Sequence, residues 1–306
     1  MTKKIALVGC GIWGQNILEE LVHFECEVHV FDSNADLKER AFELGAFSFQ
    51  DGLPSTEENL DGLIVATPST THRQVLEKLV SFNIPIFLEK PLTTTLDDAL
   101  ALQEIPHDDI YLMHIWLYHP GILLLKEIAN SGELGRIKGV RSTRANWTSP
   151  RKDTDSVWNL SPHDITIAKA ILGHIPKPKS AVAEKHDGII RGLVALLGDD
   201  PYCIFEVSNR YERKIREVRV HCEKGVAILE DEKVDYVKVV HGDAASDPKN
   251  LKTEHRTFDK TPPLRIEVEE FLNYLDGGKP PRSSFKDGIE VIKIIHEIVE
   301  LAEKPI

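Results

Sequence analysis

The sequence has few cysteines, no long hydrophobic run and no excess of positive charge. Its four cysteines form no C-x-x-C pair, which favours reduced thiols in the cytoplasm over a disulfide framework or a zinc site. No apolar stretch reaches the roughly 20 residues of a transmembrane helix. The net charge of -12 argues against nucleic acid or an anionic membrane as partner, because phosphate groups bind basic surfaces. We expect a cytoplasmic protein with no bound metal.

The first informative feature of the sequence is a glycine motif. The short apolar run Ile5–Val8 is too brief for a signal peptide and is predicted to be a strand. It leads into glycines spaced G-x-G-x-x-G, and a helical pattern follows. In this arrangement the glycines allow a tight turn, a close approach of pyrophosphate and close helix–strand packing, and the first helical amides face the phosphates. The loop residues expected to contact a dinucleotide are Gly9, Gly11, Ile12, Trp13 and Gly14.

A second apolar run ends at Asp32, eighteen residues beyond Gly14. An acid at the end of the second strand can accept both hydroxyls of an adenosine ribose, and it repels a 2′-phosphate. The cofactor predicted is therefore NAD(H) rather than NADP(H). The alternative, a glycine-rich turn in an unrelated α/β protein, leaves Asp32 unexplained.

Strands and helices alternate through the first third of the chain, as in a parallel sheet with helices on both faces. Strand patterns dominate later, over 137–147 and in several runs from 181 to 240, which favours a mostly antiparallel sheet. The polar stretch 242–263 is expected to be a surface excursion. We predict a Rossmann domain over 1–118 and an α/β domain with an open, mostly antiparallel sheet over 119–306. The last helix could pack on either domain.

Lys90 follows another predicted strand end, in Glu89-Lys90-Pro91. Ligands bind beyond the carboxyl ends of such strands. A lysine there would sit near the positive charge of a bound nicotinamide and in a partly dry cleft, and both lower a lysine pKa. It could then move a proton or polarise a carbonyl oxygen. The alternative is a solvated surface lysine.

His163 lies in a second polar constellation. Ser161 is a suitable N-cap, Pro162 fits the first helical position, and Asp164 completes a pair that is similar to a capping box. His163 is then expected in the first turn of a helix, where the dipole favours a neutral imidazole that can accept a proton. The alternative is a histidine that only caps or packs.

These segments resemble the Gfo/Idh/MocA oxidoreductases, named for glucose–fructose oxidoreductase, inositol dehydrogenase and a rhizopine-catabolism protein. The resemblance extends to about residue 173, in the family's order and spacing. It is carried by GCGIWG at 9–14, ATPSTTH at 66–72, LEKPL at 88–92, SGELGRI at 131–137 and SPHDI at 161–165.

The resemblance implies a dehydrogenase or reductase that acts on a sugar, a nucleotide sugar or a cyclitol. It also implies a substrate-binding second domain, whose sheet joins subunits in a homo-dimer or homo-tetramer. Lys90 would bind the reacting oxygen and assist proton transfer, and His163 would meet the substrate. The further cofactor contacts implied are Thr67, Pro68, His72 and Glu89.

One position departs from the family pattern. Many members have Asp four residues before the histidine, whereas this chain has Asn159. Asn can hold a substrate hydroxyl but cannot act as a base, so Lys90 and His163 would carry the proton alone. Arg144, Arg151 and Lys152 are candidates for binding an anionic substrate, with solvated surface charges as the alternative.

The function predicted is NAD-dependent hydride transfer to or from a secondary alcohol or ketone carbon. Two alternatives occur in the same family. One is redox-neutral glycoside cleavage with bound NAD, and the other is a non-catalytic dinucleotide-binding regulator.

Overall fold

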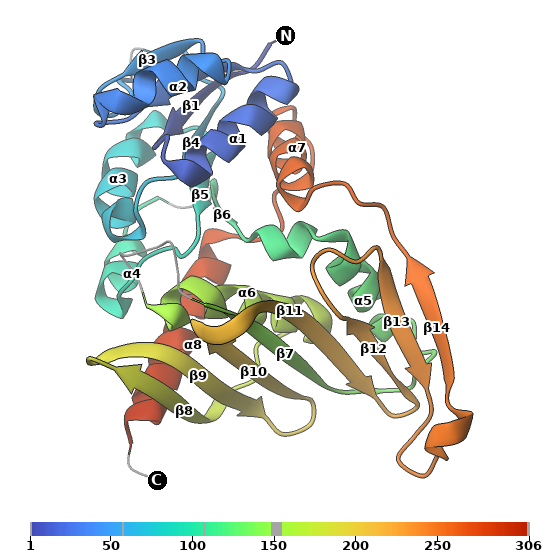
Figure 1. The fold of residues 1–306 in the computed structure, drawn as a ribbon. Coiled ribbons are helices and arrows are strands. Elements are labelled where there is room, and N and C mark those ends of the chain that lie inside the picture. Colours follow the sequence, from blue (N-terminus) through green and yellow to red (C-terminus); the bar gives the residue numbers. More distant parts are fainter. Residues whose placement is uncertain (1, 57, 107, 148–154, 305–306) are drawn as a thin grey trace. The chain divides into compact units, whose positions relative to one another are not determined.

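A computed structural model describes residues 2–304, apart from 57, 107 and 148–154. The candidates Arg151 and Lys152 therefore lie outside the described residues. The chain forms two compact units (Figure 1). Unit 1 holds the described residues up to His114 together with Pro262–Ile292, and unit 2 holds the described residues of 115–261 and those from Lys293 onward.

Unit 1 is built on a six-stranded sheet with the order β3-β2-β1-β4-β5-β6, and every neighbouring pair is parallel. Three of its strands (β4, β5 and β6) are buried along their whole length, as expected for parallel strands covered on both faces. The strands are β1 (Lys4–Val8), β2 (Glu27–Phe31), β3 (Ser48–Gln50), β4 (Gly62–Val65), β5 (Ile86–Glu89) and β6 (Ile110–Met113). This confirms the predicted Rossmann-type sheet.

The helices of unit 1 come from both ends of the chain. Figure 1 shows α7, which follows the second sheet in sequence, lying beside α1. The helices are α1 (Ile12–His23), α2 (Lys38–Glu43), α3 (His72–Leu79), α4 (Leu96–Leu102) and α7 (Pro263–Leu275). The last helix, α8 (Phe285–Glu303), contributes residues to both units.

Because the strands of unit 1 are parallel, their carboxyl ends lie along one edge of the sheet. We call it the carboxyl edge. It comprises 9–14 after β1, Asp32 after β2, 66–72 after β4 and 89–91 at the end of β5. The topology thus brings together segments that are far apart in the sequence.

Unit 2 is built on an eight-stranded sheet with the order β14-β13-β12-β11-β7-β10-β9-β8. Only the β7–β10 pair is parallel, which confirms the prediction of a mostly antiparallel sheet. The strands are β7 (Ile137–Trp147), β8 (Pro178–His186), β9 (Ile189–Gly198), β10 (Tyr202–Ser208), β11 (Arg210–Cys222), β12 (Gly225–Leu229), β13 (Tyr236–His241) and β14 (Lys252–Thr257).

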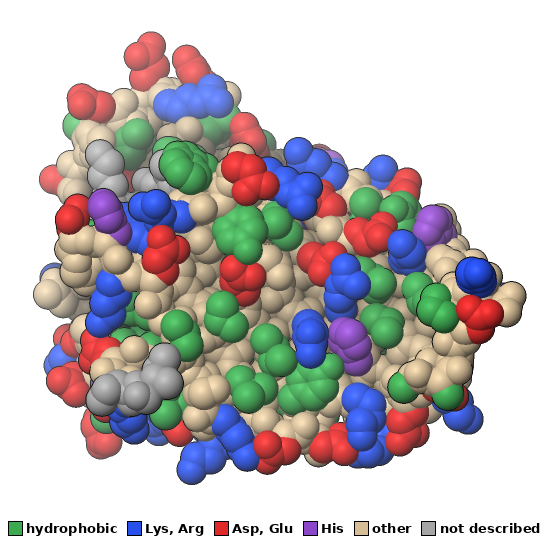
Figure 2. Space-filling model, turned by 60° about the horizontal axis from the view of Figure 1, so that its bottom comes forward, with side chains coloured by type: hydrophobic (Ala, Val, Ile, Leu, Met, Phe, Trp, Pro, Cys, Tyr) green, Lys and Arg blue, Asp and Glu red, His purple; other side chains and the backbone are tan. Residues whose placement is uncertain are grey.

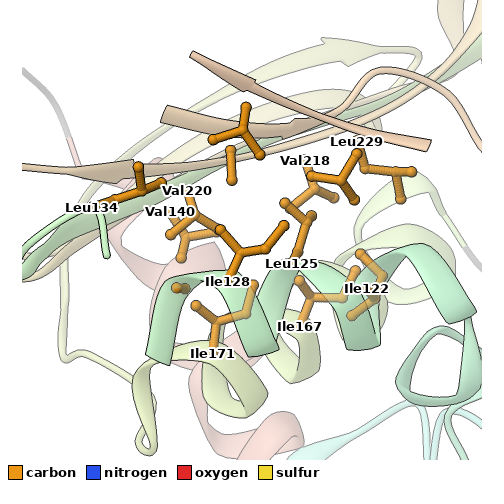
Figure 3. Packing of buried hydrophobic residues seen from close by; sticks show 14 of the residues in the cluster. Ile122, Leu125, Ile128, Leu134, Val140, Ile167, Ile171, Val218, Val220 and Leu229 are labelled. Carbon is orange, nitrogen blue, oxygen red and sulfur yellow. The ribbon is translucent and has the colours of Figure 1, made fainter. Parts of the chain in front are cut away.

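Two helices, α5 (Pro120–Asn130) and α6 (Ser156–Leu172), pack on one face of the second sheet. Figure 3 shows side chains from both helices meeting those of the strands. The members labelled there are Ile122, Leu125, Ile128, Leu134, Val140, Ile167, Ile171, Val218, Val220 and Leu229. Burial of this apolar surface holds the helices against the sheet.

Two local predictions were wrong. The stretch 242–263, expected to be a surface excursion, contains the edge strand β14, which pairs with β13. Its polar, charged composition is typical of an exposed sheet edge. Helix α6 begins at Ser156 rather than after Ser161, because the Asp155 side chain accepts hydrogen bonds from the amides of Val157 and Trp158. His163 therefore lies inside the helix, and the dipole argument for its neutral form does not apply.

Across the described residues, the longest helices are too short or too polar to cross a bilayer.

Candidate active site

The glycine loop of unit 1 needs two of its glycines for its own geometry. Gly9 has φ +96°, in the region that favours glycine. A Cβ on Gly14 would lie 2.1 Å from the Gly9 carbonyl oxygen. A Cβ on Gly11, in contrast, would meet nothing within 4 Å. Gly11 therefore leaves open surface at the start of helix α1, on the side where a ligand can approach.

The N-terminus of α1 fits an anion. Its N-cap, Gly11, offers no side-chain hydrogen bond, and the first turn contains no acidic residue. By contrast, Thr95 caps α4 and Asp155 caps α6 through their side chains. The amides of the first turn of α1 are thus left for a ligand, and a helix N-terminus of this kind suits pyrophosphate.

Asp32 is fixed against the glycine loop. Its Oδ2 accepts a hydrogen bond from the Cys10 amide at 2.7 Å, and its Oδ1 accepts one from the Asn34 amide at 2.8 Å. A carboxylate oxygen can accept more than one hydrogen bond, so both oxygens can still receive ribose hydroxyls. Burial, with a smaller effect of Asp32, raises the pKa of the Cys10 thiol to about 11, which keeps this cysteine protonated and unreactive.

His72 connects two loops of the carboxyl edge. It is fully buried, and its Nδ1 lies 2.8 Å from the Pro91 carbonyl oxygen while its Nε2 lies 3.0 Å from that of Thr67. The ring therefore lies between the two carbonyl oxygens and ties the loop after β4 to the segment after β5. Pro68, beside Thr67, is exposed. His72 thus holds the loop from beneath rather than touching a ligand.

Glu89 and Lys90 lie at the end of β5, and both are more than nine-tenths buried. One Glu89 oxygen accepts a hydrogen bond from the Trp13 indole, and the other accepts one from the Lys90 amide at 3.0 Å. Trp13 is half-exposed, and its neighbour Ile12 is 83 % exposed. The glycine loop and the Lys90 segment, predicted separately, are therefore joined by a direct contact.

Asn159 and His163 lie four residues apart in α6, in unit 2. This spacing places them one turn apart on the same helix face. Asn159 is half-buried and His163 is 8 % exposed. The pair therefore keeps the arrangement of the family pattern, with an amide in place of the carboxylate.

Arg144 of β7, the candidate for binding an anionic substrate, is buried rather than a solvated surface charge. Its side chain is 2 % exposed, and its Nε lies 3.0 Å from Oδ2 of Asp164, which is completely buried. The guanidinium also stacks over the Trp116 ring, 4.1 Å from the ring centroid. Arg144 is thus bound to the residue that follows His163.

A second arginine, Arg216, lies close to this pair. Its guanidinium donates to the Ala145 carbonyl at 2.8 Å and to Oδ1 of Asn146 at 3.0 Å. Burial, and then the charge of Arg144, lower the pKa of Arg216 to about 10. We call Trp116, Arg144, Asp164 and Arg216 the arginine cluster.

The sequence analysis missed the arginine cluster, although one signal was present. Along 137–147, Arg144 shares its alternation with Val140 and Ser142, both buried. A strand face with apolar and small residues on it usually packs against the core. Asp164 was assigned instead to a helix cap.

Comparison with known proteins agrees with this geometry. The model of the Gfo/Idh/MocA family, described as an oxidoreductase family with an NAD-binding Rossmann fold, matches residues 3–108. The first third of this chain therefore matches the family's NAD-binding domain. It is 24% identical over 300 residues to UDP-N-acetylglucosamine 3-dehydrogenase of Acidithiobacillus ferrooxidans, covering 94% of this chain and 92% of the relative. It is 21% identical over 272 residues to inositol 2-dehydrogenase of Rhizobium meliloti, covering 80% of each.

Solved structures of two dehydrogenases share the fold of nearly the whole chain. The Acidithiobacillus ferrooxidans enzyme superimposes with a TM-score of 0.83 at 21% identity, covering 99% of this chain and 100% of that one. Levoglucosan dehydrogenase in complex with NADH gives a TM-score of 0.83 at 16% identity, covering 99% and 97%. Both units of this chain therefore have counterparts in solved structures.

Proposed function

We propose that this protein is an NAD-dependent oxidoreductase that transfers a hydride to or from a secondary alcohol or ketone carbon of a sugar, a nucleotide sugar or a cyclitol. The observation that carries the proposal is the carboxyl edge. Open helix amides, a fixed acid at Asp32 and the Glu89–Lys90 segment lie together there. A dinucleotide needs this combination for its pyrophosphate, its ribose and its reactive ring.

The bound nicotinamide would supply the redox chemistry, by accepting the hydride from the substrate carbon or returning it. In the oxidation direction the alcohol also loses its hydroxyl proton, and Lys90 is proposed to accept it. His163 is proposed as the second group that handles this proton, and Asn159 holds a substrate hydroxyl through its amide. Arg144 is proposed to act through Asp164, by holding the helix that carries His163, rather than by binding substrate.

Asp32 supports NAD(H) as the cofactor. Its carboxylate is held by two backbone amides and has capacity for the ribose hydroxyls, whereas a 2′-phosphate would meet its negative charge. Thr67, Pro68 and the residues of the glycine loop are proposed as the remaining contacts, with His72 beneath them.

The first experiment is a substrate panel. Purified protein with NAD⁺ or NADH is incubated with free sugars, inositols and nucleotide sugars, and the absorbance of the reduced nicotinamide is followed. We expect a change with one of these classes, nucleotide sugars and inositols first because relatives are named for them. Release of a reducing sugar with no net change in NADH would identify a glycosidase instead. Tight NADH binding without any turnover would favour a regulator.

A homo-oligomer through the second sheet is part of the proposal. Helices cover one face of this sheet, and on the other Val182 and Val194 are cross-strand neighbours with 58 % and 46 % exposure. Figure 2 shows several hydrophobic side chains on one face of the molecule, with Lys, Arg, Asp, Glu and His among and around them. A second copy would cover such a surface. Sedimentation should give a dimer or tetramer, and lysine at both valines should shift it to smaller species.

The protein is proposed to be cytoplasmic. All four cysteines are free thiols, as in a reducing compartment.

A further inference from the structure

Glu267 of α7 is a buried acid in unit 1 that the proposed mechanism does not use. Its side chain is completely buried, and neither of its carboxylate oxygens has a hydrogen-bond partner among the described residues. It is the fifth residue of α7, beyond the first turn whose amides lack partners within the helix. An ionised carboxylate without donors is very unfavourable in such a place, so the neutral acid is the stable form.

The packing of α7 on the sheet places Glu267 next to Glu89, on the face of β5 that α7 covers. The rings of Phe271 and Phe87 stack with centroids 4.9 Å apart. Glu267 precedes Phe271 by four residues, about one helical turn. Glu89 follows Phe87 by two residues and so lies on the same face of β5. Since four helical residues and two strand residues advance by about 6.0 Å and about 6.6 Å, the two acids reach the same level.

The direction of the helix agrees with this placement. A Cβ built on Gly62, at the start of β4, would lie 3.0 Å from Leu275 and 3.2 Å from Phe271. The C-terminal end of α7 is therefore at the amino ends of the strands. Its N-terminal half, with Glu267, extends toward the carboxyl edge.

The charges around Glu267 also favour its neutral form. Burial, followed by the negative charges of Glu89 and Glu270, raises the pKa of Glu267 well above its usual value, and Arg282 opposes this shift. Arg282 is itself engaged by Glu270, with its Nε 3.0 Å from Oε1.

We propose that Glu267 is a positioning residue of the carboxyl edge: a neutral carboxylic acid behind Glu89 that keeps the Glu89 carboxylate on the Trp13 indole and the Lys90 amide. Glu89 can then carry the single negative charge of this pair and remain oriented for the cofactor. An ionised Glu267 would repel the Glu89 carboxylate. A shorter side chain at position 267 would leave space into which the Glu89 carboxylate could move, away from Trp13 and the Lys90 amide. The orientation of Glu89 for the cofactor rests on the proposed function, whereas the neutral state of Glu267 does not.

The protonation state of Glu267 is tested through the stability of the cofactor-free protein. If native Glu267 is neutral, folding takes up a proton wherever the unfolded side chain is ionised, above pH of about 4.3. Its raised pKa then costs stability progressively as pH rises from there toward the native pKa. The unfolding constant of wild type, relative to that of Glu267→Gln, should therefore rise with pH above about 4.3, by at most about tenfold per pH unit, until the pH reaches the native pKa. A ratio that is independent of pH would overturn the proposal.

Unfolding can be followed in unit 1 alone, because Trp13 is the one tryptophan in the sequence of that unit. Protein labelled with 5-fluorotryptophan gives one ¹⁹F resonance for each of the four tryptophans, and Trp13→Phe assigns the reporter. The matched control is Glu269→Gln, an exposed acid on the same helix, which should leave the ratio flat.

Positioning is tested by the Trp13 resonance of the folded protein and by NADH affinity from calorimetry. Glu267→Gln, which keeps shape and neutrality, should retain both the resonance and an affinity within about twofold of wild type. Glu267→Ala should shift the resonance and weaken NADH binding roughly tenfold. Wild-type values for folded Glu267→Ala would overturn the positioning role. Wild type that binds no NADH would contradict the proposed cofactor instead, and the Trp13 resonance alone would then decide the role of Glu267.

Discussion

The carboxyl edge of unit 1 and the arginine cluster of unit 2 hold their charged side chains in opposite ways. Asp32 and Glu89 accept hydrogen bonds from neutral N–H groups, namely backbone amides and an indole. Such donors orient a carboxylate without cancelling its charge. Arg144 is instead neutralised by Asp164. The first arrangement is suited to holding a ligand, and the second to fixing the helix that carries His163, which is proposed to handle the substrate proton.

The largest effect is expected from breaking the arginine cluster. Arg144→Met leaves the Asp164 carboxylate buried without its counter-charge, which should cost about 3–5 kcal/mol of unfolding free energy. Denaturant unfolding measures it. The double variant with Asp164→Leu removes both charges and should recover most of the loss. As a surface comparison, Arg40→Met breaks an exposed pair and should change stability by less than about 1 kcal/mol. Equal losses in both single variants would contradict the assigned role.

The glycine loop permits a paired test of structure against ligand binding. Gly14→Ala places a Cβ against the Gly9 carbonyl and should cost about 3 kcal/mol of stability. Gly11→Ala has free space, so it should fold like wild type and weaken only NADH binding. Thermal unfolding with and without NADH separates the two effects. A Gly11→Ala variant with unchanged NADH affinity would remove Gly11 from the binding surface.

A smaller effect should follow from Asp32→Asn. The amide can still accept from one backbone N–H, but it loses the charged acceptor for ribose hydroxyls, so NADH should bind about tenfold more weakly. The ratio of NADPH to NADH affinity should rise, because the repulsion is gone. Calorimetric titration with both cofactors measures this, and Asp36→Asn, a nearby exposed acid, is the control. An unchanged ratio would argue against ribose recognition by Asp32.

The two regions also differ in how far the sequence predicted them. Each part of the carboxyl edge lies within a few residues of its own strand end, so Gly9 and Asp32 could be placed from local patterns. The arginine cluster depends on strand alternation and helix register together. Ser161-Pro162 has the pattern of a helix start, but Asp155 caps the helix earlier and Pro162 is accommodated inside it. Glu267 gave no local signal, because its environment is created by packing against β5.

Lys90 is proposed to handle the substrate proton at an NAD site. This role is tested most directly by measuring NADH affinity and turnover of Lys90→Met on the substrate that the panel identifies. We expect NADH binding within a few-fold of wild type and turnover lowered by about 10²–10⁴. Turnover like that of wild type, with the variant correctly folded, would remove Lys90 from the mechanism.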